Sequence, residues 1–230
     1  MNSNDRFLAQ LGRKSSAMKK RIALLVYPEF SLQEIGNTLA LFRWYFSSPT
    51  DVIASTKAAV RSEEGVRVLP DKTVLEFSVA DYDCLILPGV SDVRPSLNDQ
   101  PLLAFLRGLK AYSELVIGAI GGGPLFLSLS GLLKGKKFTN ELYVEMNERL
   151  PFIEEENIQY QPLVVDENII TATSGAYAAF PIALARVLGY ECPEEAYQPL
   201  HGQAVSEADL KFHLDEEGVK IFEETFQDFL

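Results

Sequence analysis

The sequence has few of the residues on which several classes of protein depend. It holds two cysteines and two histidines in 230 residues, and 21 Lys and Arg against 32 Asp and Glu. Cys84 and Cys192 form no ligand-spaced pair, so we predict no disulfide framework, no metal site and no cofactor. A net charge of −11 disfavours nucleic acid and anionic membrane surfaces as partners, because both are negatively charged and repel a negatively charged protein.

Long hydrophobic runs are also missing. No apolar run approaches the roughly 20 residues that span a bilayer, and residues 1–17 lack the apolar segment of a secretory signal. We therefore expect a cytoplasmic protein. The hydrophobic content of 47% suits one domain with a full core. We place that domain at residues 19–192, after a flexible tail (1–18) and before an acidic extension (193–230). In this extension Val219, Phe222, Phe226 and Phe229 have the spacing of an amphipathic helix.

The most informative stretch runs from Leu115 to Leu127. An apolar run rich in Val and Ile predicts a buried strand, the glycines 121–123 predict a sharp turn, and Pro124 suits the first turn of a helix. This layout is that of a nucleophile elbow, with glycine at the nucleophile position, Gly121. The elbow holds that position in strained backbone geometry, costing about 1–3 kcal/mol for a residue with a Cβ, and glycine relieves the strain.

Apolar strands alternate with helical patterns along the rest of the domain. Strands are predicted at 21–27, 51–55, 83–87 and 115–120, helices at 31–46, 101–112, 125–133 and 178–188, and hairpins at 59–68 and 163–171. Ser31 is the predicted N-cap of the first helix, and Gly189 the stop of the last. This alternation predicts an α/β fold, a three-layer sandwich around a largely parallel sheet.

Three predicted loops meet where the parallel strands end. They are 27–31, 88–92 and 121–123, and ligands of such sheets bind outside the carboxyl ends of the strands. Glu34 lies in the first turns of the helix beside this crevice. The N–H groups of Gly122 and Gly123, at a helix N-terminus, favour an anion, and Val90 and Ser91 could add amides from the facing loop. Glu34 could equally be a helix acid that only complements the dipole.

These motifs resemble the DJ-1/PfpI family, within the class I glutamine amidotransferase-like superfamily. The resemblance covers about residues 19–190 and implies a flavodoxin-like fold and a homodimer. It is carried by these segments: Tyr27-Pro28-Glu29-Phe30 followed by Glu34, Tyr82-Asp83-Cys84-Leu85-Ile86-Leu87-Pro88-Gly89, Gly118-Ala119-Ile120-Gly121-Gly122-Gly123-Pro124, Gly131-Leu132-Leu133-Lys134-Gly135-Lys136-Lys137-Phe138-Thr139 and Ile169-Ile170-Thr171-Ala172.

The resemblance implies a chemistry whose reactive atom is absent here. Members that act on carbonyls, nitriles or peptides use a cysteine at the position of Gly121, supported by an acid that matches Glu34. Many also carry a histidine where Glu141 stands. No other residue replaces the thiol. Cys84 lies about four residues before the strand's end, over ~10 Å from the crevice, and Ser128 and Ser130 are at least a turn along the elbow helix.

Two hypotheses remain open. In the first, the protein is a non-catalytic family member that binds a small polar, carbonyl or carboxylate ligand. Its predicted ligand-binding residues are Gly89, Val90, Gly121, Gly122, Gly123 and Glu141. In the second, it is an active hydrolase or lyase (glyoxalase, isonitrile hydratase or amidase-like) using Glu34, with Glu141 as a partner in acid–base chemistry, or a cysteine enzyme substituted at Gly121. Glu141 could also be a solvated carboxylate without a role.

Overall fold

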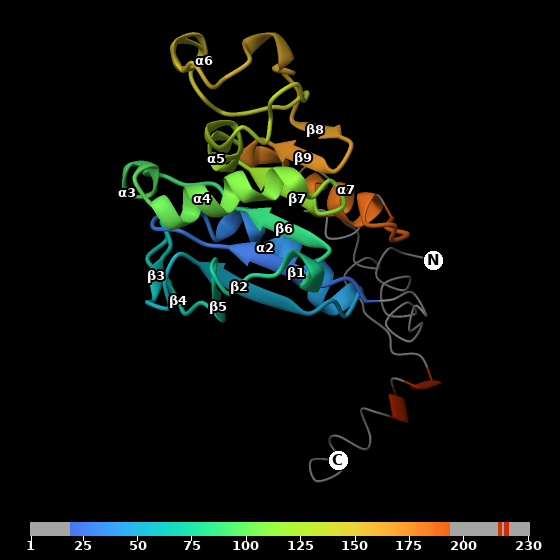
Figure 1. Ribbon diagram of the computed structural model, residues 1–230. Helices are drawn as coiled ribbons and strands as arrows, with labels where there is room; N and C mark the ends of the chain where they lie inside the picture. Colours follow the sequence, from blue (N-terminus) through green and yellow to red (C-terminus); the bar gives the residue numbers. More distant parts are fainter. Residues whose placement is uncertain (1–18, 194–215, 218, 221–230) are drawn as a thin grey trace. The chain divides into compact units, whose positions relative to one another are not determined.

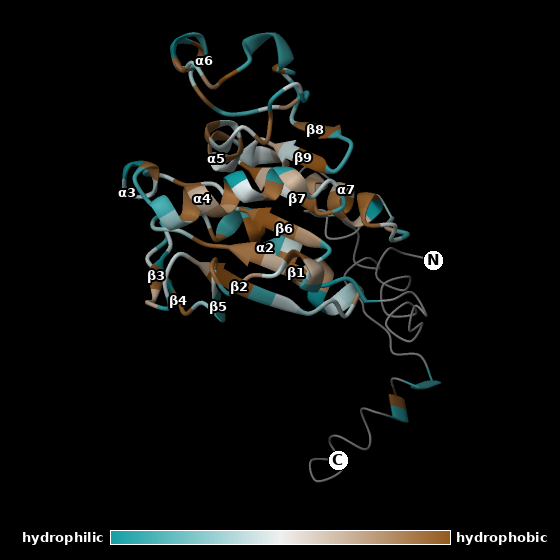
Figure 2. Ribbon diagram, in the orientation of Figure 1, coloured by the Kyte–Doolittle hydropathy of each residue, from teal (hydrophilic) through white to brown (hydrophobic). Residues whose placement is uncertain are grey.

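Four apolar segments form the centre of the sheet in the computed structural model, which describes residues 19–193, 216–217 and 219–220. They are strands β1 (Ile22–Leu25), β6 (Cys84–Leu87), β7 (Val116–Ile120) and β9 (Ile169–Ala172), and every residue in them is buried. Because they carry no alternating polar positions, both faces of the sheet are covered. Figure 2 shows the hydrophobic strands at the centre of the domain.

Seven strands are hydrogen-bonded in the order β5-β2-β1-β6-β7-β9-β8. The remaining three are β2 (Thr50–Ala54), β5 (Lys72–Thr73) and β8 (Leu163–Asp166). All neighbours are parallel except β8 and β9. The predicted α/β fold with a largely parallel sheet is confirmed. Because β2 and β6 flank β1 on opposite sides, the strand order reverses at β1, and ligand crevices open at such a reversal, beyond the carboxyl ends of the strands.

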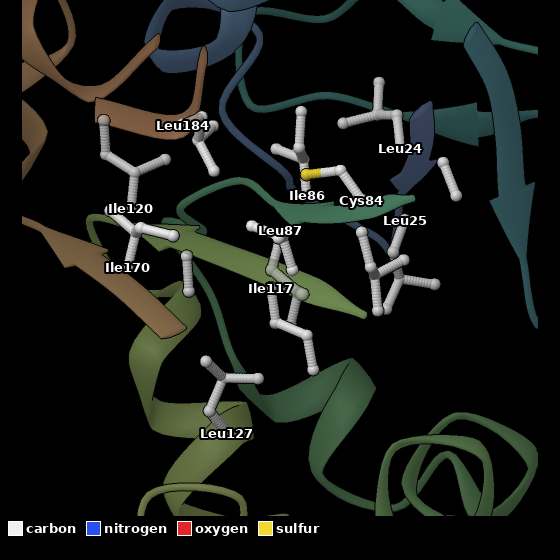
Figure 3. Packing of buried hydrophobic residues seen from close by; sticks show 14 of the residues in the cluster. Leu24, Leu25, Cys84, Ile86, Leu87, Ile117, Ile120, Leu127, Ile170 and Leu184 are labelled. Atoms are coloured by element: carbon white, nitrogen blue, oxygen red, sulfur yellow. The ribbon is translucent and has the colours of Figure 1, made fainter. Parts of the chain in front are cut away.

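Helices cover the two faces of this sheet (Figure 1). The helix α5 packs against α4, and α7 packs against β7, β9 and α2. Leu127 of α5 and Leu184 of α7 lie on opposite sides of the central strands (Figure 3). The helices are α2 (Gln33–Ala40), α3 (Arg94–Leu97), α4 (Gln100–Gly108), α5 (Gly123–Ser130), α6 (Val144–Arg149) and α7 (Ala179–Val187), with 3-10 turns at Val79–Asp81, Leu109–Ala111, Glu155–Asn157 and Ser174–Ala176.

Both predicted hairpins are present. The strands β3 (Val60–Arg61) and β4 (Arg67–Val68) pair outside the main sheet, and β8 pairs antiparallel with β9. Gly189, with φ of +85°, follows α7 as predicted. The elbow helix begins at Gly123, two residues before the predicted start, because Pro124 fits its first turn, and it ends at the left-handed Gly131.

The first helix differs from the prediction at both ends. Ser31 is not its N-cap; the cap position is Leu32, and no side chain of the cap residue serves the helix. Instead the carboxylate of Glu64, at the tip of the β3–β4 hairpin, accepts hydrogen bonds from the N–H groups of Leu32 (3.2 Å) and Gln33 (2.8 Å). At the other end the helix widens into a π-turn at Leu41–Tyr45, where the Phe46 N–H bonds to the carbonyl five residues back.

The ends of the chain test the remaining predictions only partly. The predicted tail and most of the extension lie outside the described residues, so the division of the chain stays a prediction. Of the predicted amphipathic helix only Val219 is described, and it is helical, whereas Phe222, Phe226 and Phe229 lie outside the described residues. No helix in the described part of the chain is both long and apolar enough to cross a membrane.

Candidate functional site

The carboxylate of Glu34 lies at the carboxyl edge of the sheet, where β1, β6, β7 and β9 end. Glu34 is the second residue of α2, and its side chain is half-buried. Its Oε2 accepts a hydrogen bond of 2.7 Å from the Gly89 N–H, just beyond β6. Burial raises the pKa of Glu34 to about 7; the Gly89 bond opposes this rise, and the charges of Glu141 and Glu63 add to it. The carboxyl group is therefore poised between its two protonation states near neutral pH.

The predicted elbow has the geometry that its sequence implies. The chain leaves β7, turns at Gly121 with φ of +58°, and enters α5 at Gly123. A Cβ on Gly121 would lie 2.7 Å from Oε2 of Glu34 and closer still to Oε1. Glycine thus suits the left-handed backbone, and a side chain here would also require the Glu34 carboxylate to shift. The carboxylate of Glu34 occupies the position in which a nucleophile's side chain would begin.

The two following glycines serve the packing of the elbow. A Cβ on Gly123 would lie 2.8 Å from the Pro88 carbonyl oxygen, and one on Gly122 would lie 3.2 Å from that of Val90. The elbow therefore rests directly on the segment that follows β6. A Cβ on Gly89 in that segment would meet only the Glu34 side chain, 2.6 Å from its Oε1, so it would require that carboxylate to shift.

Backbone hydrogen bonds join the loop after β1 to the loop after β6. The Ser31 N–H donates to the Gly89 carbonyl (2.8 Å), and the Ser91 N–H donates to the Glu29 carbonyl (3.2 Å). The hydroxyl of Tyr27 also donates a hydrogen bond to the Pro88 carbonyl. Tyr27 is fully enclosed, and burial raises its pKa well above the usual value, with a further rise from Glu34. These bonds fix the backbone that holds the Glu34 carboxylate.

A cavity of about 330 Å³ opens beside this carboxylate. It is lined by Ser31, Gln33, Glu34, Glu63, Ser174, Gly175 and Tyr177. Of the residues predicted for the site, Glu34 alone is among these. The predicted ligand-binding residues Gly89 and Gly121 lie against the Glu34 carboxylate, and Gly122, Gly123 and Val90 pack against one another or against the end of β6. Their role in binding stays a prediction.

Glu141 reaches the site through Ser174. Its carboxylate accepts hydrogen bonds of 2.9 Å from both the N–H and the hydroxyl of Ser174, which lines the cavity. Its charge also contributes to the raised pKa of Glu34. Glu141 itself is exposed, and a direct acid–base role for it remains a prediction.

Sequence reasoning missed the contribution of the loop after β9. Ser174, Gly175 and Tyr177 follow β9 directly. β9 is parallel to β7, so its end lies at the same edge as the elbow. The strand was recognised, and the rule that loops gather at the carboxyl edge could have added this fourth loop. Gln33 and Glu63 carry no comparable sequence signal.

No thiol of the described chain is placed for chemistry at this edge. Cys84 begins β6, at the opposite end of the strand, and its sulfur lies among aliphatic side chains (Figure 3). Burial raises its pKa far above the usual range, so the thiol is unreactive. Cys192 is also buried. Within the described ranges no group of three or more His, Cys, Asp or Glu could hold a metal ion, and His201 and His213 lie outside those ranges.

Comparison with known proteins agrees with this architecture. Residues 20–186, most of the chain, match the DJ-1/PfpI family. The chain belongs to the DJ-1/PfpI family. This DJ-1/PfpI protein is 26% identical over 182 residues to the uncharacterized protein MJ0967 of Methanocaldococcus jannaschii, covering 77% of this chain and 82% of that one. It is 29% identical over 126 residues to protein/nucleic acid deglycase 2 of Escherichia coli, covering 53% and 71%.

Solved structures share the fold of this DJ-1/PfpI protein. The DJ-1 superfamily protein Atu0886 from Agrobacterium tumefaciens superimposes with a TM-score of 0.68 at 21% identity, covering 90% of this chain and 99% of that one. At this identity the likeness concerns the fold alone. What the site does must be argued from Glu34 and the cavity beside it.

Proposed function

We propose that this DJ-1/PfpI protein binds a small polar ligand and lacks cysteine-dependent catalysis. One observation carries the proposal: the Glu34 carboxylate occupies the space next to Gly121 from which a nucleophilic side chain would extend. A thiol at this position would have to displace that carboxylate. The protein thus keeps the strand–turn–helix scaffold of the family and fills its reactive position with a half-buried acid.

The cavity supports a binding role. Its volume of about 330 Å³ lies at the lower end of the range for small-molecule sites. Its walls offer hydroxyl, amide and carboxyl groups on segments that backbone hydrogen bonds hold in place. A ligand of a few heavy atoms could be oriented there without a large change in the protein.

A second candidate function rests on the raised pKa of Glu34. A carboxyl group with a pKa of about 7 can both donate and accept a proton at neutral pH, as a general acid–base catalyst must. Glu34 faces a cavity, so a hydratase or lyase reaction driven by this carboxyl group is the alternative. One relative, from Pseudomonas putida, is named isonitrile hydratase, with 29% identity over 133 residues.

The deciding experiment measures consumption of methylglyoxal by three proteins side by side. We expect no turnover by the protein itself. Turnover by Gly121→Cys alone would show that the pocket is intact and that only the nucleophile is missing. Turnover by the parent that disappears in Glu34→Gln would instead establish the carboxyl-driven alternative. Turnover that survives in Glu34→Gln would contradict both proposals.

We further propose that the protein is a homodimer, from the resemblance to its family, and that it is located in the cytoplasm, as the sequence analysis predicts. Sedimentation velocity would give twice the mass of 25.6 kDa for a dimer. A single species at the monomer mass would reject this assembly. Cell fractionation followed by immunoblotting would test the compartment.

A further inference from the structure

The protein's own carboxylates accept the hydrogen bonds of several donors around the cavity. The Gly89 N–H, beside the elbow, donates to Glu34. Both donors of Ser174 are directed to Glu141. The N-terminal N–H groups of α2 donate to Glu64. A carboxylate ligand would have to displace an internal carboxylate in order to bond any of these donors.

The cavity also carries uncompensated negative charge. Glu34 and Glu63 line it. The charges of Glu64 and Glu141 raise the pKa of Glu34, and Glu141 also accepts a hydrogen bond from the lining residue Ser174. No Lys or Arg among the described residues lines it, and the ion pairs within the same part of the chain all involve other carboxylates. Such a field repels anions and attracts cations, and the partly enclosed walls strengthen it.

Tyr177 is the second feature that points to a cation. This residue lines the same cavity as the two carboxylates. Aromatic rings attract ammonium and guanidinium groups, and carboxylates supply the acceptors for their N–H donors. The hydroxyl of Ser31 and the amide of Gln33 can bond a second, neutral polar group of the ligand.

From this arrangement we infer that the cavity takes a small ligand carrying a protonated amine or amidine, seated between the carboxylates of Glu34 and Glu63 and beside Tyr177. The inference rests on the proposed binding function and gives its ligand class. The carboxylate of Glu34 then has a positive role as the ligand's counter-ion, in the position where a thiol would otherwise act on a carbonyl.

Three probes of equal chain length separate charge from shape: n-butylammonium, butyrate and 1-butanol. Each is titrated into the full-length protein at pH 8, with amide chemical shifts of Ser31, Gln33 and Gly175 as the readout in ¹H–¹⁵N NMR spectra. We expect saturable shifts with butylammonium, and affinity at least tenfold weaker for butyrate. Glu34→Gln and Glu63→Gln should each weaken butylammonium binding about fivefold. Glu114→Gln, an exposed carboxylate at the far edge of the sheet, should leave it unchanged.

The outcomes distinguish this inference from the proposed function. If butyrate or butanol binds at the cavity as tightly as butylammonium, the preference for a cation is wrong and the binding function stands. If none of the three saturates these shifts, the binding function fails, and the ligand class with it. Equal weakening by Glu114→Gln would mean that only the net charge of the protein matters, and would also overturn the inference.

Discussion

Two carboxylates at opposite edges of the same sheet have opposite surroundings. Asp51, near the start of β2, bonds the Arg21 guanidinium (2.8 Å) and the Tyr82 hydroxyl (2.6 Å). Lys72 lies 3.7 Å away. Burial alone would raise the pKa of Asp51, but these partners outweigh it and the pKa is lowered. At the carboxyl edge Glu34 has the Gly89 N–H and other carboxylates as neighbours, and its pKa rises to about 7.

This contrast separates a structural charge from a functional candidate. The cluster at the amino edge pairs Asp51 with two cations and ties β2 and β5 to the segments before β1 and β6. At the carboxyl edge no cation of the described residues pairs with the half-buried carboxyl group of Glu34, whose ionisation therefore costs stability. Perturbed groups of this kind gather at functional sites, although ion-pair networks also shift pKa values. The geometry of the cavity and the elbow, rather than the pKa alone, makes Glu34 the functional candidate.

The largest effect should come from breaking the compensated edge. Asp51→Ala removes the shared acceptor of Arg21, Lys72 and Tyr82, so we expect the free energy of unfolding to fall by about 2–3 kcal/mol in urea denaturation. Asp81→Asn, an exposed carboxylate nearby, should change it by less than about 0.5 kcal/mol. Equal effects of the two substitutions would mean that the cluster adds nothing beyond general surface charge.

A smaller loss should follow from adding a side chain at the elbow. Gly121→Ala places a Cβ on a left-handed backbone and against the Glu34 carboxylate. We expect about 2 kcal/mol lower stability by the same measurement. The control is Gly108→Ala, in α4, where a Cβ would meet nothing within 4 Å and should be neutral or stabilising. A tolerated Gly121→Ala would mean that neither the left-handed backbone nor the shift of the Glu34 carboxylate costs stability.

Removing the uncompensated charge should stabilise the protein at alkaline pH. The folded pKa of Glu34 is raised from 4.5 to about 7, so its ionisation costs stability as pH rises from 4.5 to 7, and the full cost remains above pH 7. Glu34→Gln should therefore have a free energy of unfolding about 1 kcal/mol higher than that of the parent at pH 8, after allowance for solvent screening of this partly exposed group. The difference should vanish near pH 4.5. Glu114→Gln should show no such pH dependence.

The smallest effect should come from the cap that the hairpin supplies to α2. Glu64→Ala removes the acceptor for the N–H groups of Leu32 and Gln33, and we expect a loss of about 0.5–1 kcal/mol because the carboxylate is exposed. Ser31→Ala should cost less, since Ser31 does not cap the helix. The reverse order in urea denaturation would restore Ser31 as the cap.

Patterns local in the sequence predicted most of the fold. Apolar runs identified three of the four central strands, β9 was predicted as one strand of a hairpin, and the glycines and Pro124 located the elbow, because backbone conformation and burial follow directly from residue type. The position of Glu34 beside the crevice followed from its place after the first strand. What the sequence could not supply were contacts across long separations. The bonds from α2 to Glu64 and from Ser174 to Glu141 join segments about 30 residues apart, and the filling of the space at Gly121 depends on a side-chain rotamer of Glu34.

The most direct test of the account is the titration of the Glu34 carboxyl group itself. Its ¹³C resonance, assigned by its absence from Glu34→Gln, can be followed from pH 3 to pH 9 in the intact protein. A midpoint of about 7 is predicted, because burial and neighbouring carboxylates disfavour the charged form. A midpoint near the ordinary value of about 4.3 for glutamate would contradict it, and would mean that Glu34 is solvated and does not occupy the place of a nucleophile.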